Sequence, residues 1–181
     1  MLSAGGHDVV AITSSPSKSD YIKGLVAGHH KGGGPGELTV VVANDDPRFS
    51  KAVLASGGPA DLVVENVGAP TMEQSLRSLK SGGKIVLIGN VTNSTFELPL
   101  GMCIVKSLSV IGTDSCEAGE VQKMMAWMQE NNLKPSIDVV LPLNEAAAAH
   151  EMVEARRIEG RVVLRVAGDG DTWDTNLPHL P

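Results

Sequence analysis

The sequence has few cysteines and few aromatic residues. Cys103 and Cys116 are its two cysteines, and Phe, Trp and Tyr together make up 3% of the 181 residues. A structural zinc site needs four ligands in close pairs, and two widely separated cysteines do not provide them. We therefore expect no metal bound by this chain, and we expect both cysteines to be buried thiols, as free cysteines often are.

Long hydrophobic runs and an excess of basic charge are also absent. No apolar stretch approaches the roughly 18 residues that cross a bilayer, and the first residues, MLSAGGHD, lack the basic and apolar regions of a signal peptide. These absences predict a cytoplasmic protein without a membrane partner. The net charge is −6, and Lys and Arg are scattered along the chain, which excludes nucleic acid as a partner.

The sequence does have alternating β-rich and helical stretches, and 42% of its residues are hydrophobic. This alternation predicts the α/β class, with a doubly wound parallel sheet of the Rossmann type. We expect strands at 8–13, 38–43, 61–67, 84–90, 108–113 and 161–166. We expect helices near 17–27, 47–56, 70–80, 117–131 and 144–156, the third ended by the glycines of KSGGK (80–84). Residues 1–167 would form a partial dinucleotide-binding domain, with a C-terminal return near 135–167, and 168–181 a disordered tail.

Candidate ligand-binding residues follow three of the expected strands, because doubly wound sheets bind ligands outside the carboxyl ends of their strands. They are Ser14, Ser15 and Lys18, then Asn66, Val67 and Gly68, then Gly89, Asn90 and Val91. An acidic residue at the position of Ser14 would accept hydrogen bonds from a ribose 2′-hydroxyl, whereas hydroxyls and Lys18 fit a 2′-phosphate. Alternatively, Ser14 and Ser15 cap the helix that Pro16 starts.

Several stretches carry a family resemblance. AITSSPSK, ADLVVENVGAPTMEQSLRSLKSGGKIVLIGNVT, LSVIGT and EAAAAHEMVEARRIEGRVVLRV resemble the cofactor-domain half of the medium-chain dehydrogenase/reductase superfamily, in its quinone oxidoreductase and zinc-type alcohol dehydrogenase-like branch. The resemblance runs from residue 7 to about 166. It implies an NADP(H)-dependent oxidoreductase and cofactor contacts from the nine residues above. It adds Arg161 in EGRVVL as a cofactor contact, and a homodimer formed through the LSVIGT sheet edge.

The first strand, the glycine-rich turn and the catalytic domain of that superfamily have no counterpart in this sequence. We therefore expect a sheet that lacks its first strand, and a cofactor-binding portion that is inactive alone, with no catalytic residue of its own. In the strand order 3-2-1-4-5-6 the first strand is central, so its absence leaves two apolar sheet edges.

Two other functions stay open. One is a non-catalytic dimerisation or binding module that has this fold. The other is an S-adenosylmethionine-dependent methyltransferase, because DLVVENV followed by LKSGGKIVLIG is also typical of such sheets. Against the methyltransferase, no acidic residue ends the strand expected at 8–13, where the ribose hydroxyls would be held.

Overall fold

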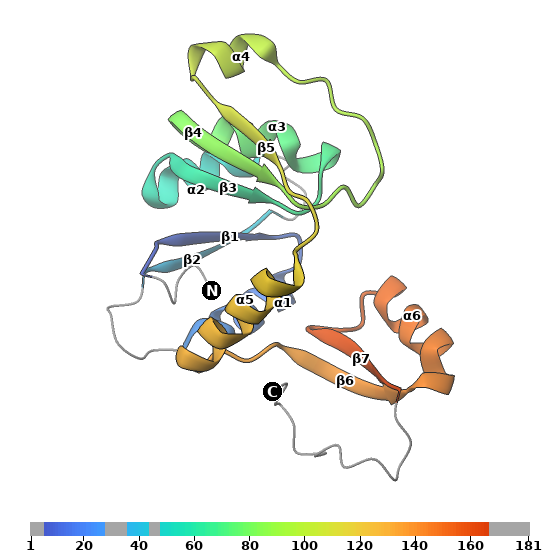
Figure 1. Ribbon diagram of the computed structural model, residues 1–181. Helices are drawn as coiled ribbons and strands as arrows, with labels where there is room; N and C mark the ends of the chain where they lie inside the picture. The colour runs from blue at the N-terminus through green and yellow to red at the C-terminus, as the bar shows by residue number, and fades with distance from the viewer. Residues whose placement is uncertain (1–5, 28–35, 44–47, 167–181) are drawn as a thin grey trace. The chain divides into compact units, whose positions relative to one another are not determined.

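The computed structural model describes residues 6–27, 36–43 and 48–166 (Figure 1). The strands are β1 (Val9–Thr13), β2 (Leu38–Val42), β3 (Ala60–Glu65), β4 (Leu79–Leu87), β5 (Ser109–Gly112), β6 (Ile137–Pro142) and β7 (Arg161–Arg165). The helices are α1 (Pro16–Ala27), α2 (Phe49–Gly57), α3 (Ala69–Ser78), α4 (Leu100–Val105), α5 (Ala118–Glu130) and α6 (Ala146–Glu154), with a short 3₁₀ helix at Leu143–Glu145.

All six predicted strands and all five predicted helices are present near their expected positions, whereas β6 and α4 were not predicted. The prediction that glycines end the third helix is wrong. Helix α3 ends at Ser78, because Leu79 is already extended (φ −76°, ψ 145°) and its buried side chain belongs to β4. Residues 80–83 instead form an irregularity in β4, opposite a register shift after Ala60 in β3.

The described strands pair in parallel, in three groups: β1 with β2, β3 with β4 and β5, and β6 with β7. The chain divides into two compact units, 2–120 and 121–181. Among the described strands, β1 pairs only with β2, and β3 pairs only with β4. The parallel α/β class is thus confirmed.

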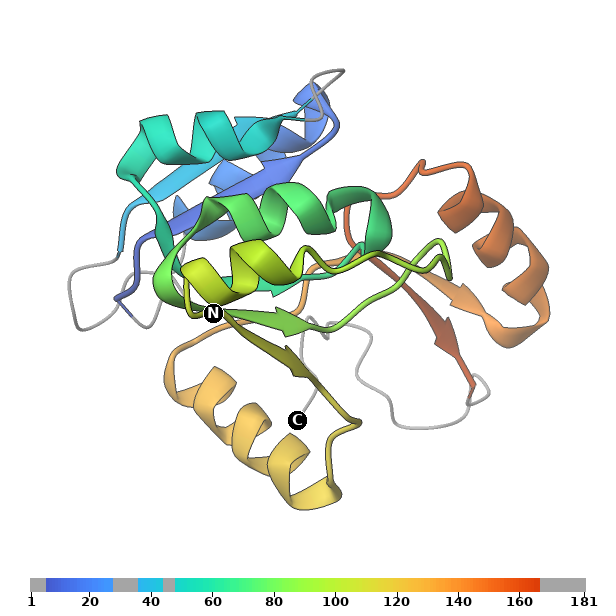
Figure 2. The same ribbon diagram turned by 90° about the horizontal axis from the view of Figure 1, so that it is seen from above.

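The core of the 2–120 unit lies between α3 and the β3–β4–β5 sheet, and Figure 2 shows this helix over these strands. Met72 and Leu76 lie one helical turn apart on α3 and are buried, and they meet buried Leu79 and Ile85 of β4. Glu73 and Arg77 of the same helix are exposed. Helix α3 is therefore held by one apolar stripe, which fixes where its N-terminus meets the end of β3.

The described residues include no helix that is long and apolar enough to span a membrane. The expectation of two buried thiols is wrong for Cys116, which is exposed, and only partly right for Cys103, which is half-buried. Cys116 lies between β5 and α5, in a stretch of exposed residues that offers no core to bury it. Cys103 lies in α4, which has no buried residue.

Candidate functional site

The turns that follow β3 and β4 run side by side. Ile88 and Gly89 donate their backbone N–H groups to the carbonyl oxygen of Glu65, at 2.9 and 3.2 Å, and Val91 donates to Val67 at 2.9 Å. This ladder continues the parallel pairing beyond both strands. Six of the ten predicted site residues are therefore brought together, namely Asn66, Val67, Gly68, Gly89, Asn90 and Val91.

Two glycines allow this close approach. A Cβ atom on Gly89 would overlap the backbone carbonyl of Asn66. Gly68 has φ +97°, which favours glycine, and a Cβ atom there would lie 2.7 Å from Oδ1 of Asn90. Each glycine is thus required by the neighbouring turn, which goes beyond the ordinary role of glycine after a strand.

Glu65 is the central residue of these turns, and the sequence analysis did not identify it. Glu65 is buried, with 3% of its surface exposed to solvent. Oε1 accepts hydrogen bonds from the N–H groups of Val67 (2.8 Å) and Gly68 (3.0 Å) and from the Thr71 hydroxyl (2.7 Å), and Oε2 accepts one from the Ser75 hydroxyl (2.5 Å). The carboxylate thus joins the end of β3, the turn and the first turns of α3.

The pKa of Glu65 lies below its ordinary value. Burial acts in the opposite direction and would raise the pKa. The hydrogen bonds from Ser75, Gly68, Thr71 and Val67 outweigh burial, because all four donors favour the charged form. The sequence does carry a signal for Glu65. It is a single acidic residue at the end of an apolar strand, followed by a glycine and by hydroxyl residues at helical spacing.

Ser14, Ser15 and Lys18 form a second group, at the end of β1. The N–H of Ser15 donates to Oγ1 of buried Thr13 at 3.2 Å, and the N–H of Lys18 donates to the Ser15 carbonyl at 3.2 Å. The hydroxyls of Ser15 and Ser17 share a hydrogen bond of 2.7 Å. The hydroxyl of Ser15 therefore pairs with another hydroxyl rather than capping a backbone N–H, and Ser14 is exposed.

The donor set at this strand end suits an anion. Residues 13–18 contain hydroxyls and one ammonium group and no carboxylate. The nearest acidic side chain along the helix, Asp20, lies 3.6 Å from Nζ of Lys23. Lys18 is half-buried and forms no ion pair with any residue that the structure describes. Hydroxyl groups with one uncommitted cation can hold a phosphate group.

Arg161 belongs to the 121–181 unit, apart from the 2–120 unit that holds the other nine residues. It is exposed on β7, and its N–H donates to the carbonyl of Ser136 at 2.8 Å. Over residues 6–27, 36–43 and 48–166, no three His, Cys, Asp or Glu side chains are placed to hold a metal ion.

Solved structures of similar fold define the class of this domain. A structure named AibC gives a TM-score of 0.70 at 31% identity, and covers 87% of this chain and 41% of its own. An NAD-dependent alcohol dehydrogenase gives a TM-score of 0.70 at 30% identity, over 88% of this chain and 44% of its own. The domain is thus of the Rossmann type found in the cofactor-domain half of the medium-chain dehydrogenase/reductase superfamily.

The model of the zinc-binding dehydrogenase family matches residues 37–164, and the chain belongs to that family. It is 29% identical over 161 residues to acryloyl-coenzyme A reductase of Sulfurisphaera tokodaii, covering 88% of this chain and 44% of the relative. It is also 29% identical over 136 residues to a probable quinone oxidoreductase of Schizosaccharomyces pombe, covering 71% of this chain and 39% of the relative. The chain therefore spans less than half the length of these curated relatives.

Proposed function

We propose that this chain forms the NADP(H)-binding portion of an oxidoreductase of the quinone reductase or alcohol dehydrogenase-like type. The observation that carries the proposal is the pair of adjoining turns, 66–68 and 89–91, at the carboxyl ends of two parallel strands. Ligands of doubly wound sheets bind at such strand ends. The names of its relatives, which are reductases and dehydrogenases, support hydride transfer rather than methyl transfer.

The residues of both groups fit a nicotinamide cofactor, which supplies the hydride that such enzymes transfer. Asn66 and Asn90 carry amides that can bind polar groups of the cofactor, and Val67 and Val91 offer exposed apolar surface for a ring. The group at the end of β1 would hold the adenosine 2′-phosphate. Arg161 is proposed as a further contact on the resemblance alone.

We further propose that the groups that hold and activate the substrate belong to residues outside these 181. The chain covers 44% of the acryloyl-coenzyme A reductase that it resembles. In the turns themselves, the carboxylate of Glu65 is engaged by four hydrogen bonds and buried. The chain alone would then bind cofactor without reducing a substrate, and we propose that it does so in the cytoplasm.

Replacing Lys18 by Ala should weaken NADPH binding by roughly ten- to a hundredfold and leave NADH nearly unchanged. A hydrogen bond to a charged group contributes about 1.5–3 kcal/mol, and only NADPH carries the 2′-phosphate. Isothermal titration calorimetry of both cofactors with the 181-residue chain measures the contrast. S-adenosylmethionine is titrated alongside, because its binding in place of both cofactors would favour a methyltransferase.

Lys23→Ala is the matched control, because it removes one positive charge from the same helix at an exposed position. It should leave both affinities unchanged. Equal losses of affinity for NADPH and NADH in Lys18→Ala would contradict a 2′-phosphate site. Lys18 would then be a solvated surface charge.

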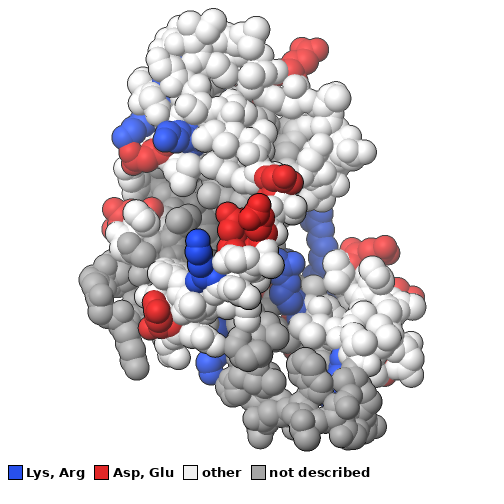
Figure 3. Space-filling view, viewed as in Figure 1, with Lys and Arg blue, Asp and Glu red and all other residues white. Residues whose placement is uncertain are grey.

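The chain should form a homodimer through strand β5. All four residues of β5 are exposed, including Val110 at 39% and Ile111 at 42%, and its single partner among the described strands is β4. The neighbouring surface over α4, at the top of Figure 3, is largely without charged side chains. An exposed apolar edge strand pairs readily with another chain.

Light scattering after size exclusion should give the mass of a dimer for the unchanged chain and of a monomer for Val110→Lys. A charged side chain on an edge strand opposes pairing. Val121→Lys, at an exposed position on α5, is the control and should remain dimeric. A monomeric unchanged chain at high concentration would refute the β5 interface.

A further inference from the structure

Glu65 holds both turns of the candidate site, each with a different part of the residue. Its backbone carbonyl accepts the N–H groups of Ile88 and Gly89, at 2.9 and 3.2 Å, and so ties down the turn that follows β4. Its side-chain carboxylate accepts the N–H groups of Val67 and Gly68, at 2.8 and 3.0 Å, and so ties down the turn that follows β3. The spacing of the two turns therefore depends on this one residue.

The carboxylate of Glu65 is buried without a cation beside it. The residue is 3% exposed and forms no ion pair with any residue that the structure describes. Its charge is balanced by N–H and hydroxyl donors. Burying a charge costs free energy that a neutral side chain of similar size would avoid. The carboxylate is therefore better explained by the turn that it holds than by the stability of the sheet.

A carboxylate suits the turn at 66–68 better than a neutral acceptor does. Gly68 is the N-cap residue of α3, and the N–H groups at the start of a helix carry partial positive charge. Hydrogen bonds to a charged acceptor are also roughly twice as strong as those to a neutral one. A phosphate group is disfavoured beside this turn, because it would meet a like charge. The turn is therefore suited to an uncharged part of a ligand.

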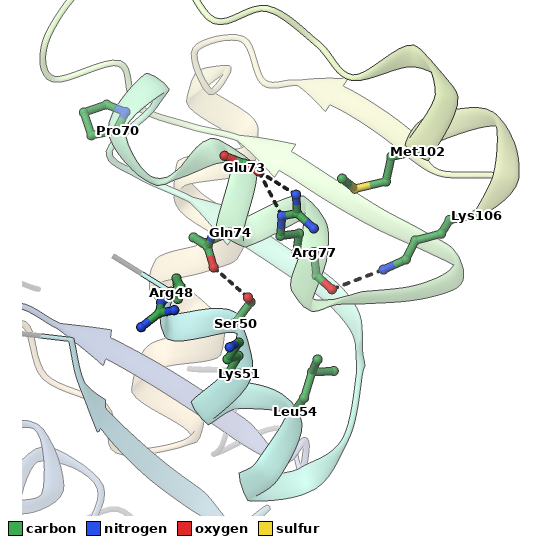
Figure 4. Close-up of a pocket in the computed structure, with 10 residues that line it drawn as sticks. All are labelled: Arg48, Ser50, Lys51, Leu54, Pro70, Glu73, Gln74, Arg77, Met102 and Lys106. Atoms are coloured by element: carbon green, nitrogen blue, oxygen red, sulfur yellow. Dashed lines mark hydrogen bonds and ion pairs between the residues drawn. The ribbon is translucent and has the colours of Figure 1, made fainter. Parts of the chain in front are cut away.

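Helix α3, which supplies two hydroxyl donors to Glu65, is itself fixed in place. The hydroxyl of Ser50 in α2 donates to Oε1 of Gln74 at 2.6 Å. Nζ of Lys106 donates to the carbonyl oxygen of Arg77, near the end of the helix, at 3.1 Å (Figure 4). The carboxylate is therefore held at a fixed point, and the turn that it binds follows that point.

The two turns present amide and apolar groups to a ligand. Asn66 and Val67 are exposed on one turn, and Asn90 is exposed on the other. A Cβ atom on Gly68 would lie 2.7 Å from Oδ1 of Asn90, so this amide lies directly against the backbone that Glu65 holds. Glu65 itself is too buried to contact a ligand. Its effect on binding must therefore pass through the turns.

We propose that Glu65 is a positioning residue, which orients Asn66 and Asn90 toward the nicotinamide half of the cofactor. This role rests on the proposed function, which assigns the 2′-phosphate to the group at the end of β1 and leaves the nicotinamide half to these turns. Both cofactors carry that half. A change at Glu65 should therefore weaken NADPH and NADH to the same extent, unlike a change at Lys18.

Glu65→Gln is the test variant, because glutamine keeps the shape of the side chain and one accepting oxygen. Calorimetry with the 181-residue chain should show NADPH and NADH each bound roughly three- to tenfold more weakly, since a neutral acceptor forms weaker hydrogen bonds. At saturating NADPH, the fluorescence of the bound reduced nicotinamide should move toward that of free NADPH, because the ring loses its fixed contact with the turns. A loss of stability alone would leave this fluorescence unchanged while the chain is folded.

Ile85→Val is the matched control, because it destabilises the same sheet by removing one fully buried methylene and leaves the hydrogen bonds of both turns in place. At a temperature at which both variants are folded, its NADPH affinity and fluorescence should equal those of the unchanged chain. Normal NADPH affinity in Glu65→Gln, a loss confined to NADPH, or an equal loss in Ile85→Val would overturn the proposal. An unchanged chain that binds neither NADPH nor NADH would refute the proposed function itself, and this role with it.

Discussion

Glu65→Ala should lower the free energy of unfolding by about 3–5 kcal/mol. The substitution leaves the N–H groups of Val67 and Gly68 and the hydroxyls of Thr71 and Ser75 without their acceptor. Each buried donor without a partner costs about 1–3 kcal/mol, and water entering the space left by the side chain recovers part of the total. Urea unfolding followed by circular dichroism measures the loss.

The contribution of Glu65 to stability should depend on pH. Its pKa in the folded chain is below that of the unfolded chain, so its contribution is fully present above the unfolded pKa, about 4.3. The contribution is lost as the pH falls through the lower, folded pKa. The difference in unfolding free energy between the unchanged chain and Glu65→Gln should therefore be largest near pH 7 and shrink below about pH 4.

Glu97→Gln is the control, because it removes the same charge at an exposed position. It should change stability by no more than about 0.5 kcal/mol. The difference in unfolding free energy between the unchanged chain and Glu65→Gln could instead stay constant from pH 7 to pH 3. That result would show that the carboxylate contributes its shape and not its charge. Glu65→Ala within about 1 kcal/mol of the unchanged chain would refute its role in holding the turn.

Gly89→Ala should lower the free energy of unfolding by about 2–4 kcal/mol and remove measurable binding of both nicotinamide cofactors. The added methyl group would overlap the backbone carbonyl of Asn66, and a backbone atom cannot move away as the end of a flexible side chain can. The turns at 66–68 and 89–91 would separate, which misplaces the proposed cofactor contacts. Thermal unfolding and calorimetry with NADPH measure the two effects.

Gly24→Ala separates this effect from the general effect of replacing a glycine. Gly24 lies in α1, and a Cβ atom there would meet nothing within 4 Å. Alanine should therefore stabilise the chain by about 0.5–1 kcal/mol, through its better helix propensity. Similar changes in stability and in NADPH binding for Gly24→Ala and Gly89→Ala would show that the turns at 66–68 and 89–91 tolerate separation.

Most elements of the fold could be predicted, because apolar runs bounded by turn residues mark each strand and helix locally. Helix α4 could not, because six residues make fewer than two turns and show no helical period. The start of β4 was misplaced for another reason. Leu79 continues the apolar spacing of α3 in the sequence, but in the structure it is extended and its buried side chain belongs to β4.

The candidate site was predictable in part. Strand order along the chain places 66–68 and 89–91 at the ends of neighbouring parallel strands, and the structure brings them together. The role of Glu65 was not predicted, because its partners at Thr71 and Ser75 become neighbours only when α3 folds back over the sheet. The sequence carried only an indirect signal for it, the glycine and the hydroxyl residues that follow this carboxylate. Arg161 belongs to the 121–181 unit, and its contact with the cofactor stays a prediction from the resemblance.

The sequence by itself determined the succession of parallel βαβ units, the strand ends where ligands can bind, and the hydroxyl and ammonium donors that follow Thr13. These features follow from local composition and periodicity. The tertiary structure alone decided the register that sets Gly89 against Asn66, and the burial of the Glu65 carboxylate. Both depend on how β3 meets β4 and α3, and these elements pack around Leu76 and Ile85.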